Sequence, residues 1–107
     1  MKTIHEWQRE LVLAANEKYP INKEWSQEDR LMSMAQQLAD VYQARMIEKK
    51  MLPPDPRMKS IEHRVAALIA DTLLFCEMRG VDIEPELHGI LDFFKDKDAK
   101  RSRETLG

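Results

Sequence analysis

Ala66-Ala67-Leu68-Ile69-Ala70-Asp71-Thr72-Leu73-Leu74-Phe75-Cys76 is the stretch that decides the fold of this chain. It is apolar except for Asp71 and Thr72, contains no Gly or Pro, and is too long for a typical strand. A helix that is apolar on nearly every side is usually buried inside a bundle. An ionised carboxylate in such a helix is costly unless it is paired, hydrogen-bonded or bound to a metal. The group that faces Asp71 is therefore central to any function.

The composition predicts one soluble domain over residues 1–107. The chain is 43% hydrophobic and 34% charged, and its three glycines and five prolines are few, which favours long regular elements. Its 17 Lys and Arg against 19 Asp and Glu leave a net charge of -2. This balance argues against general electrostatic binding of nucleic acid.

The sequence predicts a cytoplasmic protein. Cys76 is the only cysteine, so no internal disulfide can form, and a reducing compartment is the simplest interpretation. The N-terminal residues lack the apolar core of a signal peptide. The longest apolar run is shorter than the ~20 residues that a membrane-spanning helix needs, so no membrane partner is expected.

Hydrophobic periodicity and capping residues predict four helices and no strand. A proline-rich segment at residues 52–56 separates the second helix from the third, and residues 96–107 read as a charged, solvated tail. The expected class is all-α, a four-helix bundle. The four helices are expected at about residues 4–18, 27–50, 58–79 and 82–95.

The second helix is expected to pack through one apolar stripe. The stripe consists of Leu31, Met34, Leu38 and Val41. A different, more polar face carries Ser33, Gln36, Gln37, Asp40 and Ala44. Because the helices are long for so short a chain, part of their apolar surface is expected to be buried between copies.

Asp40 and Asp71 lie in the middle of the two longest expected helices. Two inward carboxylates on facing helices are a common way to hold a divalent metal. Two other interpretations remain open. Asp40 can instead lie on a solvated face, and Asp71 can form a buried salt bridge, with Arg64 or Arg45 as the candidate partners.

Four segments, two in each half of the chain, resemble one protein family. Residues 25–31 (WSQEDRL) and 35–41 (AQQLADV) resemble the first half of a MazG-like nucleotide pyrophosphohydrolase, where a helix carries a Glu-x-x-Glu metal motif. Residues 68–75 (LIADTLLF) and 79–84 (RGVDIE) resemble the second half. The order and spacing of elements match from about residue 4 to 101.

The resemblance implies an all-α dimer or tetramer that uses Mg²⁺ to split a nucleoside triphosphate into monophosphate and pyrophosphate. Aligned in this way, Gln37 and Leu68 stand where two of the four metal-binding carboxylates, both glutamates, belong. Asp40 replaces another glutamate with a shorter acid, and Asp71 matches its position. Since two of four charges are missing, only weak Mg²⁺ binding by Asp40 and Asp71 is expected.

The same resemblance suggests four substrate-binding residues: Gln37, Trp25, Lys95 and Arg101. Trp25 would stack on a base, and the two basic residues would contact phosphates. Each has an alternative. Trp25 can instead pack in the core or in an interface, and the basic residues can belong to a solvated tail of mixed charge.

Two function classes follow from these features. The first is a divergent MazG-like domain that binds a nucleotide or acts as a weak Mg²⁺-dependent pyrophosphohydrolase. The second is a catalytically inactive helical protein that retains the fold for dimerisation or interaction. In both, a homodimer or homotetramer is expected.

Overall fold

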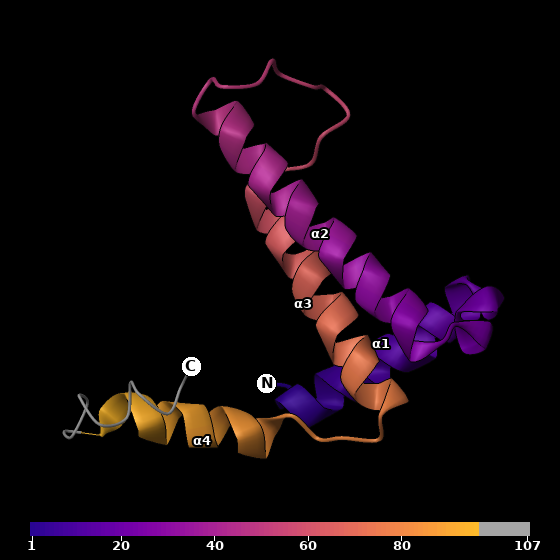
Figure 1. The fold of residues 1–107 in the computed structure, drawn as a ribbon. Helices are drawn as coiled ribbons and strands as arrows, with labels where there is room; N and C mark the ends of the chain where they lie inside the picture. The colour runs from indigo at the N-terminus through magenta and orange to yellow at the C-terminus, as the bar shows by residue number, and fades with distance from the viewer. Residues whose placement is uncertain (97–107) are drawn as a thin grey trace.

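The computed structural model describes residues 1–96, which form four α-helices, one 3₁₀ turn and no strand (Figure 1). The all-α class is therefore confirmed. The elements in chain order are α1 (Ile4–Lys18), η1 (Pro20–Glu24), α2 (Gln27–Glu48), α3 (Ile61–Met78) and α4 (Glu84–Lys95).

Side chains that cap the helices explain where they begin. Thr3 and Glu6 form a capping box at α1, and Ser26 with Asp29 forms another at α2. The Ser60 hydroxyl accepts the backbone N–H of His63, so α3 starts at Ile61 and not at residue 58. α2 ends two residues earlier than expected, at Glu48.

α2 and α3 lie side by side and form a long arm, and α1 crosses the lower end of this arm beside α3 (Figure 1). Near that crossing, Gln8 of α1 is completely buried, with 0% of its surface exposed. Its amide nitrogen donates to Glu77 of α3 at 3.0 Å and to the backbone oxygen of Val81 at 3.0 Å. Its amide oxygen accepts the backbone N–H of Ile83 at 3.3 Å. Gln8 therefore joins α1 to α3 and to the segment that leads into α4.

α4 extends away from the other helices and packs extensively against none of them (Figure 1). Gly80 (φ 65°) follows α3 in the left-handed conformation that favours glycine and turns the chain outward. The Asp82 carboxylate accepts the backbone N–H of Glu84, the first residue of α4. Large apolar side chains along α4 are exposed: Leu87, Ile90, Leu91 and Phe94.

The face of α2 that packs on α3 mixes polar and apolar residues, so the expected apolar stripe is only partly right: Met34 and Val41 are half-buried. Arg30 and Ala44 are buried, whereas Leu31 and Leu38 are exposed, Leu38 to 58%. Arg30 and Asp40 are drawn to this interface because each pairs with a charged residue of α3. Ion pairs therefore help to set the orientation of α2, and Leu31 and Leu38 face outward.

α3 is less enclosed than its composition suggested. Asp71, Leu74 and Cys76 are buried, but Val65 and Ile69 are exposed on the side away from α2. Within residues 1–96, no helix combines the length and the apolar character that crossing a bilayer would require.

Candidate functional site

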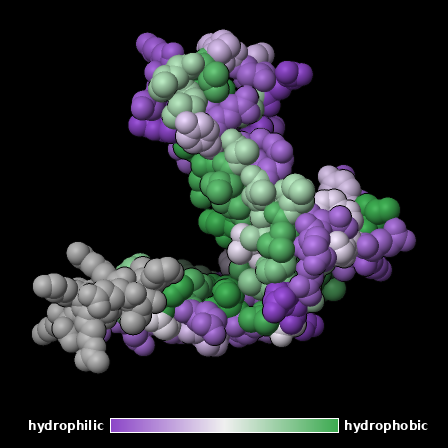
Figure 2. Space-filling model, in the orientation of Figure 1, coloured by the Kyte–Doolittle hydropathy of each residue, from purple (hydrophilic) through white to green (hydrophobic). Residues whose placement is uncertain are grey.

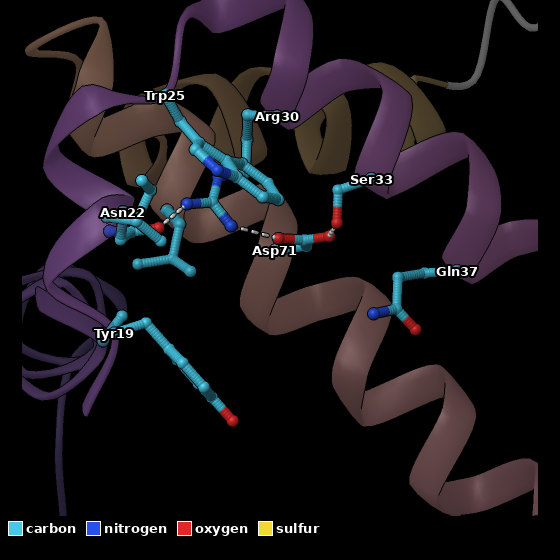
Figure 3. Close-up of a pocket in the computed structure, with 10 residues that line it drawn as sticks. Tyr19, Asn22, Trp25, Arg30, Ser33, Gln37 and Asp71 are labelled. Atoms are coloured by element: carbon cyan, nitrogen blue, oxygen red, sulfur yellow. Dashed lines mark hydrogen bonds and ion pairs between the residues drawn. The ribbon is translucent and has the colours of Figure 1, made fainter.

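A pocket of about 400 Å³ opens where the C-terminal end of α1, η1, α2 and α3 meet (Figure 3). Its size lies within the range typical of small-molecule sites, and its walls are mostly apolar with a few converging polar groups. The lining residues are Ala15, Tyr19, Ile21, Asn22, Trp25, Arg30, Ser33, Gln37, Asp71 and Leu74.

Local sequence explains why these side chains converge. Pro20 fixes the first turn of η1, which carries Asn22 back toward α2 and leaves Trp25 just before the Ser26 cap. Once α2 has started, Arg30, Ser33 and Gln37 follow at intervals of three and four residues and so share one helix face. That face is the one turned toward Asp71 on α3.

Asp71 makes a buried ion pair with Arg30. Arg30 Nη1 donates to Asp71 Oδ1 at 2.7 Å, and the two residues are 5% and 6% exposed. The Ser33 hydroxyl donates to the other carboxylate oxygen, Oδ2, at 2.5 Å. Both carboxylate oxygens therefore have a donor, which meets the condition for placing this charge in an apolar helix.

Arg30 is held from two further sides. Its Nη2 donates to Asn22 Oδ1, and the Asn22 amide in turn donates to Asn16 Oδ1 at 2.7 Å. Its guanidinium lies 4.6 Å from the centre of the Trp25 ring, in cation–π contact. Figure 3 shows this chain of contacts from Asn22 through Arg30 to Asp71 and Ser33.

Two buried polar atoms of the pocket residues have no hydrogen-bond partner: Gln37 Oε1 and Arg30 Nε. A buried acceptor or donor that is left unpaired costs about 1–3 kcal/mol. A ligand that offers a donor to Gln37 and an acceptor to Arg30 would recover part of this cost.

The structure gathers three of the predicted site residues and separates the others. Trp25, Gln37 and Asp71 all line the pocket. Asp40 does not, and it pairs instead with Arg64 of α3 at 3.4 Å and with Gln36 at 3.1 Å. Lys95 is the last residue of α4 and lies away from the pocket, while Arg101 falls outside the described residues.

The salt-bridge interpretation of Asp71 is confirmed, but both suggested partners were wrong. Arg64 pairs with Asp40, and Arg45 pairs with Glu48 one turn along its own helix. The partner is Arg30, which lies near the start of α2. An antiparallel pair brings the start of α2 close to the second half of α3, so Arg30 reaches Asp71 and Arg45 cannot.

The donor set around Asp71 does not fit Mg²⁺. This ion requires several hard oxygen ligands in near-octahedral geometry. Asp71 already accepts from a cation and a hydroxyl, Gln37 is neutral, Leu68 has no ligand atom, and Asp40 belongs to a different ion pair. Among residues 1–96, no three His, Cys, Asp or Glu side chains lie close enough together to hold a metal.

Seven pocket residues were not anticipated: the apolar Ala15, Ile21 and Leu74, and the polar or aromatic Tyr19, Asn22, Arg30 and Ser33. Arg30 and Ser33 carry a usable sequence pattern, because they precede Gln37 at helical spacing and so occupy its face. Tyr19 and Asn22 carry none, since they flank a proline in a connection whose path depends on packing.

Cys76 is buried on α3 and does not line the pocket. Burial, with a smaller effect from the neighbouring Glu77, raises the pKa of its thiol. A raised pKa lowers the thiolate fraction at neutral pH, so Cys76 is a structural residue and not a nucleophile.

The fold and the pocket define an all-α helical protein with a buried ion pair at a small-molecule-sized site. Comparisons with protein-family models, with curated proteins and with solved structures find no match to this chain. The MazG-like resemblance therefore stays a prediction, and the function is argued from the pocket itself.

Proposed function

We propose that this chain is a nucleotide-binding helical protein that holds its ligand without metal-assisted hydrolysis. The observation that carries the proposal is the pocket, which is lined by two aromatic rings, Tyr19 and Trp25, and by the polar Gln37 and Arg30, with the Trp25 ring against the Arg30 guanidinium (Figure 3). Aromatic side chains bind bases of any sequence by stacking. The MazG-like resemblance points to the same class of ligand.

The ion pair between Asp71 and Arg30 supports binding in place of catalysis. In the metal-dependent interpretation, Asp40 and Asp71 would hold Mg²⁺, and the metal would activate a water molecule. In this structure a guanidinium occupies the position beside Asp71 that a metal would need. Hydrolysis of nucleoside triphosphates therefore remains a prediction that the geometry does not favour.

We predict that a nucleotide raises the melting temperature of the protein by several degrees, equally with and without Mg²⁺. A ligand present at 100 times its Kd stabilises the folded state by about 2.7 kcal/mol. Thermal-shift measurements with nucleoside mono-, di- and triphosphates, each with EDTA, Mg²⁺ or Mn²⁺, test this expectation.

The two tryptophans provide a matched control for that screen. Trp25→Leu is expected to abolish the shift, whereas Trp7→Leu, on the exposed part of α1, is expected to retain it. Release of pyrophosphate that requires Mg²⁺ and is lost in Asp71→Asn would restore the hydrolase interpretation. No shift with any nucleotide would exclude nucleotide binding.

Unpartnered apolar surface supports a second candidate function, self-association of the chain. Eight of the exposed large apolar residues lie on α2 and α4: Leu31, Met32, Leu38, Tyr42, Leu87, Ile90, Leu91 and Phe94. Figure 2 shows apolar residues on the visible face of the α2–α3 arm and again on α4. A lone helix of α4's length is marginal in water without a packing partner.

The accessible surface gives the scale of this unpartnered area. The chain exposes 8619 Å², whereas a compact protein of 12.6 kDa is expected to expose about 6200 Å². Deducting about 1800 Å², the most that the 11 residues 97–107 can expose, leaves about 6800 Å². A compact protein of the remaining 96 residues is expected to expose about 5700 Å², so an excess of about 1100 Å² remains. A standard interface buries about 800 Å² per partner, so the excess is large enough for a stable dimer.

We predict that the protein is a dimer or larger at micromolar concentration and that Leu38→Glu combined with Tyr42→Glu makes it monomeric. Both side chains are exposed by more than half, so charges there oppose association without disturbing the contact with α3. Analytical ultracentrifugation of the wild type, the double variant and the neighbouring control Gln43→Glu measures the change. The test concentration of about 100 µM is on the order of the Kd of a weak interface. A wild-type protein that is still monomeric there would rule out self-association.

A further inference from the structure

The pocket wall carries no net charge. Arg30 and Asp71 are the only ionisable groups among its ten lining residues apart from the Tyr19 phenol, and they pair with each other. The Arg30 guanidinium is further engaged by Asn22 and by the face of Trp25. A phosphate placed inside would lose its hydration and find no free cation, which is strongly unfavourable.

The walls favour a flat and largely apolar ligand. Ala15, Ile21 and Leu74 contribute apolar surface, and Tyr19 contributes an aromatic ring at the open side (Figure 3). A volume of about 400 Å³ accommodates a heterocycle with a small substituent but is small for a whole triphosphate with its counter-ions.

The unpaired atoms define which polar groups a ligand must present. Gln37 Oε1 requires a donor, and Arg30 Nε requires an acceptor. Both atoms are buried, so side-chain rotations must accompany binding. Gln37 follows Arg30 by two helical turns, about 10 Å along α2, so one ring edge does not meet both atoms. An N–H group on the ring, as a nucleobase carries, serves Gln37 Oε1.

We propose that the pocket recognises an uncharged planar heterocycle of the nucleobase or nucleoside class, with an N–H group donating to Gln37 Oε1, and that phosphate groups stay outside. This inference rests on the proposed nucleotide binding and specifies which part of the ligand the site holds.

Isothermal titration calorimetry in EDTA, with the full chain and each free base, nucleoside, monophosphate and triphosphate, tests the inference. For the preferred base, the Kd of the nucleoside is expected to lie within about threefold of the Kd of its triphosphate, because the phosphates stay outside the pocket and contribute little to the binding free energy. A tenfold difference in Kd would correspond to ~1.4 kcal/mol. Binding of triphosphate with no detectable binding of any nucleoside or base would overturn the inference while leaving nucleotide binding intact. No binding by any ligand would overturn both.

Gln37→Leu tests the role of the amide directly. The variant removes a buried unpaired acceptor, so it is expected to fold at least as stably as the wild type. The affinity for the nucleoside is expected to fall about tenfold or more, whereas Gln43→Leu, at an exposed position on the same helix, leaves it unchanged. Equal affinity in wild type and Gln37→Leu would overturn the assigned contact.

Discussion

Asp71→Asn is expected to lower the free energy of unfolding by about 3–5 kcal/mol, because it leaves the Arg30 guanidinium buried without its counter-charge. A protein of this size has a total stability on the order of 5–15 kcal/mol, so the loss is a large part of it. Urea denaturation followed by circular dichroism measures the change. The melting temperature is expected to fall by at least 10 °C, at about 4–8 °C for each kcal/mol.

Asp40→Asn is the matched control for Asp71→Asn. Asp40 also pairs with an arginine across the α2–α3 interface, but both side chains are partly exposed and the atoms are 3.4 Å apart. Its loss is expected to cost about 1 kcal/mol or less. The double replacement Arg30→Met with Asp71→Leu is expected to recover most of the stability, since an apolar pair can replace a buried ion pair.

The opposite result would identify a different role for Asp71. If Asp71→Asn raised the stability, the wild-type carboxylate would be carrying an uncompensated charge, as expected for a metal ligand in a metal-free site. In that case Arg30 would not be the main partner of Asp71, and the result would support the metal-dependent interpretation.

Gln8→Ala is expected to lower the free energy of unfolding by about 2–4 kcal/mol. The fully buried Gln8 amide makes three hydrogen bonds, and its removal leaves the partly buried Glu77 carboxylate, Val81 carbonyl and Ile83 N–H without this partner. Each buried polar group left unpaired costs about 1–3 kcal/mol, and the small cavity adds to this. Chemical denaturation measures the loss.

Gln8→Ala is also expected to increase local opening of the segment that leads into α4. Two of the three hydrogen bonds end on residues 81–83, the segment that carries α4, so native-state hydrogen exchange there should accelerate more than exchange within α2. Gln43→Ala, on the exposed face of α2, is expected to change stability by less than about 0.5 kcal/mol. Uniform acceleration across all helices would show that Gln8 acts on global stability and not on α4.

The limits of prediction are clearest at α2. Its start at residue 27 was predicted correctly, but its orientation did not follow from its apolar stripe. Counting apolar residues assumes that the buried face is the apolar face. Here Arg30, Ser33 and Asp40 make polar contacts with α3, so Leu31 and Leu38 are turned outward. A single sequence does not show which ion pairs will form between helices.

Gln8 shows the same limit on a smaller scale. On α1 the large apolar Trp7 is half exposed, whereas the polar Gln8 is fully buried. Gln8 follows Ile4 by one helical turn, so its position on the packed face was visible in the spacing. Its partners were not, because Glu77, Val81 and Ile83 are about 70 residues away along the chain.

The sequence by itself determined the all-α class, the approximate extent of each helix and the need for a partner at Asp71. These properties depend on local spacing, on capping residues and on the cost of burying a charge, all of which act over a few residues. The tertiary structure decided that the partner is Arg30, that Tyr19, Trp25 and Gln37 share a pocket, and that α4 leaves the arm. Those outcomes depend on how the helices meet, and the contacts that decide them join residues far apart in the chain.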